Sequence, residues 1–447
     1  RTEPRALRLA ALGRDPPPLG AAATADTVGI ARSLVPTGTP PTRLWSVIVG
    51  RAILGPFGLH DPEAFVSGSR AEVERIRQSN PSLRHHPFQV PRPGRPRVFV
   101  MGGALLAPEG QRPAEGSVWP LQMSPDFTGF PFRPAGGAVR YDSESFFDPD
   151  LRGLAVGGGL IQTFAFGGDA PRAQAGGQGV RLPAPAMPFT LTDMVGISSA
   201  AFAGKISGFG SGVVSEGFDP LAEIWPVLPN GNRSQAALKY KLGDGSILDD
   251  SGLLVMLQRR VEKVVWFVNT DTPIAGRGEF DWCNATHGEV DPFQKVSNQV
   301  YDKFGHGTGL LGNNQVFAKE ELPRVVCALQ GLRDEGKPAV AHFRHAVLRN
   351  DWWGIAGGYE LEVVYVYNEV VEEFVDALPA DTKAELQKGT TFVNYPFYRT
   401  MFNNLRQPTA LTAAQVNLLA AQAEYAVRAN GALLSRVLSR RPSWWRW

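Results

Sequence analysis

The stretch KLGDGSILDDSGLL, which begins at Lys241, places the carboxylate of Asp244 between Gly243 and Gly245. Flanking glycines allow the backbone to turn sharply and to approach other groups closely. A carboxylate in such a turn can serve as a general base if a reacting hydroxyl lies within hydrogen-bond distance. The alternative is that Asp244 only stabilises the turn or caps the helix that follows, because aspartate is common in turns for that reason.

The residues around Asp244 resemble a known family. GDGSILDDSGLLVMLQRRVEKVVWFV, which begins at Gly243, is similar to the Asp-Gly-Gly region of the cytosolic phospholipase A and fungal phospholipase B (lysophospholipase) superfamily, to which patatins are more distantly related. In that region a polar stretch, a Leu-rich helix, a basic residue and an apolar strand follow the aspartate. Ser246 replaces the third glycine of the family, and Asp250 stands where asparagine is usual.

A second segment carries the same resemblance. DMVGISSAAFAG, residues 193–204, is similar to the Gly-Thr-Ser-Ser-x-x-Phe segment of fungal phospholipase B. The order of the segments agrees, so the resemblance covers roughly residues 45–272. It implies a supporting role for Ser198 and Ser199, whose hydroxyls are expected to satisfy buried backbone groups near the site.

The resemblance implies a lipid acyl hydrolase in which a serine–aspartate dyad cleaves a glycerophospholipid or lysophospholipid ester, with no metal and no cofactor. Asp244 is the expected base, because serine is a poor nucleophile until a neighbouring group takes its proton. The family serine lies in a Gly-x-Ser-Gly-Gly elbow, and no Gly-x-Ser-x-Gly occurs among the 447 residues. The nearest sequence is Gly196-Ile197-Ser198-Ser199-Ala200.

Two hypotheses follow from the missing elbow. In the first, the serine lies on an upstream segment or a companion chain released by proteolytic processing. The buried segments 44–59 and 97–105 are then expected to lack sheet neighbours within this chain, since folded proteins avoid unpaired buried backbone. In the second, the chain is a catalytically inactive scaffold or assembly subunit that keeps the fold.

Other combinations of residues point to little further chemistry. His342 and His345 are spaced to share a helix face and bind a metal, but no third ligand is evident and packing is the alternative. Cys283 and Cys327 are the only cysteines, too few for a disulfide framework or a zinc site. A net charge of +2 gives no electrostatic footprint for nucleic acid.

The elements that must position Asp244 read as an α/β protein, a patatin- or phospholipase-like central sheet flanked by helices. Strands are predicted at 97–108, 261–270 and 359–368, and a buried helix at 44–59. A short helix is expected over 252–261 and a long amphipathic helix over 408–441, with Thr412 as its cap. Strands that alternate with helices are typical of one α/β sheet.

Three regions are expected along the chain: an extended Ala/Pro-rich arm at 1–42, a phospholipase-like α/β domain at 43–405, and a helix with an Arg/Trp tail at 406–447. No apolar run reaches about 18 residues, so we expect a soluble or peripheral protein without a membrane span. Trp444, Trp445 and Trp447 alternate with arginines in the tail. This composition suits contact with a membrane surface, and packing of the tail on the body is the alternative.

Overall fold

The computed structural model describes residues 3–34, 37–94, 96, 98–113, 118–131, 141–143, 155–156, 159–173, 179–200, 220–224, 226–227, 237–286, 288, 290–293, 295–399 and 410–439. The chain forms two compact units, one built from residues 27–250 and the other from residues 1–26 together with 251–447. We call residues 27–250 the inner unit and the rest the outer unit, because of their order along the chain, and each unit is described by itself. The Arg/Trp tail with Trp444, Trp445 and Trp447 lies outside the described residues.

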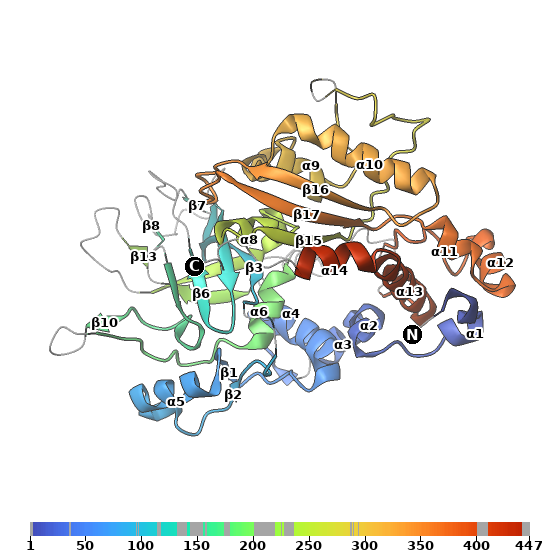
Figure 1. The fold of residues 1–447 in the computed structure, drawn as a ribbon. Helices are drawn as coiled ribbons and strands as arrows, with labels where there is room; N and C mark the ends of the chain where they lie inside the picture. The colour runs from blue at the N-terminus through green and yellow to red at the C-terminus, as the bar shows by residue number, and fades with distance from the viewer. Residues whose placement is uncertain are drawn as a thin grey trace. The chain divides into compact units, whose positions relative to one another are not determined.

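The inner unit is organised around a six-stranded antiparallel sheet with the strand order β12-β14-β3-β5-β6-β9. Figure 1 labels two of these strands, β3 and β6. Its strands are β3 (Met101–Pro108), β5 (Trp119–Met123), β6 (Phe127–Phe130), β9 (Gly159–Gln162), β12 (Leu221–Ile224) and β14 (Leu238–Asp244). The described residues of this unit also form short strand pairs: β1 (Phe65–Val66) with β2 (Phe88–Gln89), β4 (Gln111–Pro113) with β7 (Tyr141–Ser143), β8 (Ala155–Val156) with β13 (Pro226–Val227), and β10 (Arg172–Ala173) with β11 (Val180–Arg181).

Helices accompany this sheet. They are α3 (Thr27–Leu34), α4 (Pro41–Val49), the π-helix η4 (Gly50–Leu54), α5 (Arg70–Ser79) and α6 (Leu191–Ser198), with 3₁₀ turns at Gly55–Phe57, Pro81–Leu83, Thr163–Ala165 and Gly245–Ile247. The predicted helix over 44–59 therefore corresponds to α4, the π-helix η4 and the 3₁₀ turn Gly55–Phe57 in succession. Helix α6 packs against α4, β3 and β14, and it starts at a capping box in which Thr190 and Asp193 each bind the other's backbone N–H.

Strand β3 is paired on both edges, with β14 on one side and β5 on the other. The expectation that segment 97–105 lacks sheet neighbours within this chain is therefore wrong. The physical reason is that β14 and β5, which the sequence analysis did not predict, supply the missing hydrogen bonds. The sheet itself gives no reason to require a strand from a companion chain.

The outer unit contains a three-stranded sheet in which β17 (Tyr359–Tyr367) lies between β15 (Lys263–Val268) and β16 (Val340–Val347). The β15 pairing is parallel and the β16 pairing is antiparallel. Residues 361–367 are all buried, as expected for a central strand covered on both faces. Helices α10 (Leu322–Asp334) and α14 (Gly431–Ser439) lie on opposite faces of this sheet (Figure 1).

The remaining elements of the outer unit are short apart from one helix. They are η1 (Pro4–Ala6), α1 (Leu9–Leu12), α2 (Pro18–Ala21), η2 (Ala22–Thr24), α8 (Leu253–Gln258), α9 (Asn298–Tyr301), η11 (Asp302–Phe304), η12 (Gly309–Asn314), η13 (Lys319–Glu321), α11 (Glu372–Asp376), α12 (Ala380–Lys388) and α13 (Ala413–Ala429). The predicted helix over 408–441 is divided at Asn430 into α13 and α14. Its predicted cap is confirmed, because Thr412 forms a capping box with Gln415.

The structure bears out the α/β class and corrects the predicted arrangement of the strands. The predicted strands at 261–270 and 359–368 lie together in the outer-unit sheet, whereas the strand at 97–108 belongs to the inner-unit sheet. The segment 1–42, expected as an extended arm, contains the short helices α1, α2 and α3 and is divided between the two units.

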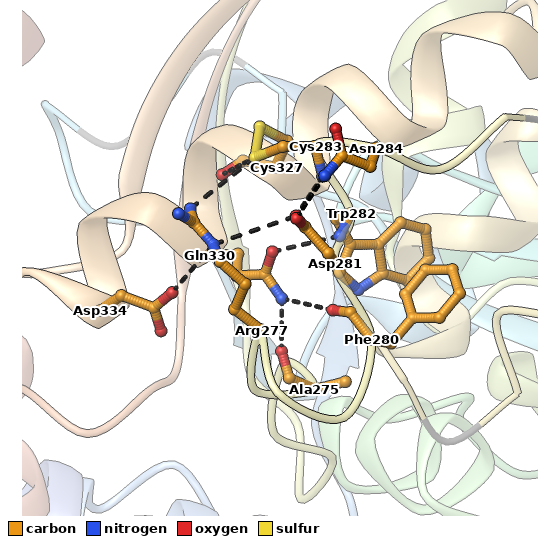
Figure 2. Close-up of a disulfide and its surroundings, with 10 residues drawn as sticks. All are labelled: Ala275, Arg277, Phe280, Asp281, Trp282, Cys283, Asn284, Cys327, Gln330 and Asp334. Carbon is orange, nitrogen blue, oxygen red and sulfur yellow. Dashed lines mark hydrogen bonds and ion pairs between the residues drawn. A yellow bond between two sulfur atoms is a disulfide. The ribbon is translucent and has the colours of Figure 1, made fainter.

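A disulfide that the sequence analysis did not predict joins Cys283 to Cys327 of α10 (Figure 2). Beside it, the buried side-chain amide of Gln330 accepts a hydrogen bond from the backbone N–H of Trp282 and donates to the backbone carbonyls of Ala275 and Phe280. The loop 275–284 is thus fastened to one helix by a covalent bond and by three hydrogen bonds from a single side chain.

Candidate functional site

Asp244 is the last residue of β14, an interior strand of the inner-unit sheet. Only 7% of the residue is exposed. The structure therefore places Asp244 at the carboxyl end of an interior strand and gives its carboxylate a fixed and largely buried position. Whether it faces a substrate cleft stays a prediction.

The Asp244 side chain holds the turn that follows it. Its Oδ1 accepts a hydrogen bond from the Ser246 N–H at 2.7 Å, which caps the 3₁₀ turn η10 (Gly245–Ile247). Gly252, the residue before α8, makes no side-chain cap. The Asp244 carboxylate thus caps the first turn after β14.

The two flanking glycines are required by close packing. In the antiparallel register Asp244 lies opposite Gly103 of β3. A Cβ added to Gly245 would lie 2.8 Å from the Gly102 carbonyl carbon and 3.0 Å from the Gly103 N atom, and both are backbone atoms. A Cβ on Gly243 would meet the Leu106 side chain at 3.1 Å. The Gly-Asp-Gly sequence therefore lets the turn lie backbone to backbone against β3.

Ser198 and Ser199 lie at the carboxyl end of α6. The Ser199 hydroxyl donates to the Val195 carbonyl at 2.8 Å and accepts from the Trp45 indole N–H at 3.2 Å. Ser199 thus satisfies a backbone carbonyl of its own helix, which also packs against η10. The supporting role at a catalytic site that the resemblance implies for Ser198 and Ser199 stays a prediction. Ser198 is the last residue of a regular helix, which is unlike the strand-to-helix turn of a nucleophile elbow.

Gly196, the glycine of the near match to an elbow, has a packing role. A Cβ at this position would lie 2.2 Å from the Ser46 Oγ of α4. Its absence allows α4 and α6 to approach closely. The glycine is therefore explained by contact between helices, and nothing at Gly196 indicates a nucleophile.

A cavity of about 380 Å³ opens beside α6 in the inner unit. Phe166, Phe189 and Ile197 form a buried apolar wall, and the two phenylalanine rings are 4.7 Å apart between centroids. Met187 stands at the cavity with 63% of its surface exposed. The volume falls in the range of small-molecule sites. The sequence analysis missed this cavity because its wall comes from segments that no local motif connects.

Charged side chains also line the cavity. An Nη of Arg43 lies 3.5 Å from Asp193 Oδ2, an ion-pair distance longer than a normal hydrogen bond. The same Asp193 oxygen accepts hydrogen bonds from the N–H and hydroxyl of Thr190, at 3.0 and 2.8 Å. Glu223 and Lys239 lie opposite each other on β12 and β14 and line the cavity as well. Arg43 is thus held beside an apolar space by a carboxylate that helix capping keeps in place.

The histidine pair is arranged differently from the metal site considered from its spacing. His342 and His345 are in strand β16 and not on a helix, because the segment pairs along its length with β17. His345 is fully buried, with Nδ1 2.6 Å from Glu321 Oε2 and Nε2 3.0 Å from the Tyr365 hydroxyl. No cluster of three or more metal-ligating side chains occurs among the residues that the structure describes. Packing, the alternative reading, accounts for His345.

Within the described ranges, no helix is both long enough and apolar enough to cross a membrane. Comparison of the chain with protein-family models, with curated proteins and with solved structures gave no match in any of the three. The geometry of Asp244 and of the cavity therefore carries the functional argument together with the family resemblance of the sequence.

Proposed function

We propose that this chain contributes the catalytic base of a lipid acyl hydrolase of the phospholipase or lysophospholipase type, with Asp244 as the base. The observation that carries the proposal is the largely buried Asp244 carboxylate at the end of an interior strand, held by the Ser246 N–H. A base must be fixed within hydrogen-bond distance of the hydroxyl that it deprotonates. The patatin-like arrangement and the Ser–Asp dyad belong to this proposal.

In the proposed reaction the Asp244 carboxylate takes the proton of a serine hydroxyl while the serine oxygen attacks the ester carbonyl carbon. The alcohol leaves with a proton, and water then releases the fatty acid from the acyl-enzyme. The serine is proposed to come from an upstream segment or a companion chain, because the 447 residues contain no Gly-x-Ser-x-Gly. The substrate is a glycerophospholipid or lysophospholipid.

A second candidate is a catalytically inactive scaffold of the same fold. The observation that favours it is the hydrogen bond from the Ser246 N–H to Asp244, since a carboxylate that caps a turn is fully explained by local structure. The two candidates differ in what they require of Asp244. The scaffold needs a capping side chain, whereas the hydrolase needs a proton acceptor.

Asp244→Asn separates the candidates, because asparagine caps about as well as aspartate and lacks the basic carboxylate. The native protein, isolated with any companion chain, is incubated with phosphatidylcholine and lysophosphatidylcholine while fatty-acid release is measured, and it is labelled with a serine-directed fluorophosphonate. We expect hydrolysis to fall by at least about 100-fold in Asp244→Asn and labelling to fall with it. The side chain introduced by Asp244→Asn keeps an oxygen that can accept the Ser246 N–H, so the variant is expected to stay folded, which circular dichroism checks.

Asp249→Asn, five residues along the same chain segment, is the matched control and should keep the wild-type activity. Fatty-acid release that is unchanged in Asp244→Asn would exclude Asp244 as the base. Failure of the wild-type preparation both to hydrolyse these lipids and to take up the label would favour the scaffold.

A further inference from the structure

The cavity beside α6 combines two features that single out a class of ligand. Its inner wall is apolar and aromatic, formed by Phe166, Phe189 and Ile197, and the lining residue Met187 adds apolar surface that is 63% exposed. Transfer of an apolar group from water to such a wall is favourable in proportion to the area buried. The wall is therefore suited to a hydrocarbon chain, which needs contact area and no specific polar partner.

The charged residues determine the other end of the ligand. Arg43 carries several N–H donors in a planar fork that matches carboxylate and phosphate groups. One of its nitrogens is 3.5 Å from Asp193, so the guanidinium is oriented by an acid without a short hydrogen bond to it. Lys239 adds a second positive charge among the lining residues, and Glu223 lies opposite it. An anionic head group placed at Arg43 gains charge-assisted hydrogen bonds.

We propose that this cavity is a binding site for a single-chain amphipathic anion, with the acyl chain on the Phe166–Phe189 wall and the carboxylate or phosphate at Arg43. Fatty acids and lysophospholipids with an anionic head share this chemistry. The choice of an acyl chain rests on the proposed lipid hydrolase function, whose substrates or products have this form. The cavity itself rests on the geometry of the inner unit.

The site is separate from the Asp244 turn. Lys239 lines the cavity and Asp244 ends the same strand five residues later, which places their Cα atoms about 17 Å apart in an extended strand. Ile197 connects the two regions: it lines the cavity, and its Cγ2 would lie 2.9 Å from a Cβ on Gly103, the residue opposite Asp244. A bound chain would therefore contact the helix that packs on the Asp244 strand.

The test is isothermal titration of the full chain with dodecanoate, dodecyl phosphate and dodecanol, each below its critical micelle concentration. We expect saturable binding of both anions and at least about tenfold weaker binding of the uncharged alcohol. Dodecanoate carries the carboxylate of a fatty acid and dodecyl phosphate carries the phosphate of a lysophospholipid. The anion with the lower Kd therefore shows which of these two ligands the site prefers.

Three variants locate the site. Arg43→Gln should raise the Kd of the anions by about tenfold or more and leave dodecanol unchanged, since only the charge is removed. Ala222→Phe, which adds a ring to a lining residue, should weaken all three ligands. Arg51→Gln is the matched control, an exposed arginine in the π-helix after α4 that does not line the cavity, and should bind as the wild type does.

Saturable anion binding that is insensitive to both Arg43→Gln and Ala222→Phe, or no saturable binding by wild-type protein with intact circular dichroism, would overturn the proposal. Each variant is accepted only if its thermal midpoint matches the wild type within the error, and Ala222→Leu replaces Ala222→Phe if the larger ring unfolds the protein. Asp244→Asn should bind normally. A wild-type protein that binds the anions without hydrolysing the lipids would contradict only the hydrolase proposal, and one that hydrolyses the lipids without binding the anions would contradict only the cavity proposal.

Discussion

A fully buried histidine in the outer unit shows how one residue can carry a pH response. The Nδ1–H of a neutral His345 can donate to Glu321 while Nε2 accepts from the Tyr365 hydroxyl, so one tautomer satisfies both neighbours. Burial lowers the pKa of His345 and outweighs the Glu321 carboxylate, which acts in the opposite direction. The neutral form is thus favoured in the folded state.

This pKa shift predicts that acid destabilises the outer unit. Below about pH 6.5 the unfolded histidine binds a proton that folded His345 resists, so the unfolding free energy should fall as the pH decreases from about 7 towards 5. Urea unfolding across this range should show a smaller pH dependence in His345→Gln than in the wild type. Tyr365→Phe removes the hydroxyl that donates to Nε2 of the neutral ring, so it should lower the unfolding free energy most at neutral pH and make the slope shallower than in the wild type. Equal slopes in wild type and His345→Gln would contradict the assignment.

At the scale of elements, the turn η10 is packed on β3 through backbone atoms. Gly245→Ala should therefore destabilise the inner unit by about 1–3 kcal/mol, because the new Cβ meets backbone that cannot rotate away. Gly55→Ala is the matched control: nothing lies within 4 Å of its added Cβ, and its effect should stay within about 0.5 kcal/mol. Urea unfolding of both variants measures the difference. Equal stability of the two would show that η10 does not pack on β3 as described.

The elements show how far the sequence could predict this fold. Alternation and apolar runs identify β15 and β17, and the Thr412 cap is readable from Thr and Gln at the correct spacing. Pairing of strands is not local information, so the division of the predicted strands between two sheets could not be read from periodicity. The spacing of His342 and His345 suggests a shared helix face. Both residues lie instead in the strand β16, because this segment pairs along its length with β17.

The candidate site was predictable only in part. The order Gly-Asp-Gly followed by an apolar helix and strand is contiguous, so it identifies Asp244 as a candidate, whereas the strand β14 that ends at Asp244 was not predicted. The cavity combines Arg43 with Phe166, Phe189 and Lys239, residues almost 200 positions apart that meet only after folding. Such a set carries no spacing signal in a single sequence.

Across the whole molecule, the chain leaves the outer unit after residue 26 and returns to it at residue 251. Within the outer unit the first segment is fastened to late helices. The Thr382 hydroxyl donates to the Leu7 carbonyl at 2.6 Å, and the Asn417 amide donates to the carbonyls of Leu12 and Arg14. Leu7 and Leu12 belong to an apolar cluster with Phe374 and other residues of the late helices. Figure 1 shows α1 and α2 beside α13.

Leu12→Ala should therefore destabilise the outer unit by about 2–5 kcal/mol, since the side chain is fully buried in a cluster that spans the chain. Leu19→Ala is the matched control in the same segment: Leu19 is 88% exposed, and its removal should cost less than about 0.5 kcal/mol. Thermal and urea unfolding of the two variants provide the comparison. A Leu12→Ala protein as stable as Leu19→Ala would mean that the first segment does not complete this cluster.

The pairing of residues 7–14 with residues 371–421 also has a consequence during synthesis on the ribosome. About 360 residues separate Leu12 from Val371, so at ordinary translation rates the early leucines leave the exit tunnel on the order of tens of seconds before their partners exist. The inner unit, residues 27–250, is complete by then. For that interval the nascent chain presents an apolar segment whose partners are not yet made, a state that holding chaperones bind.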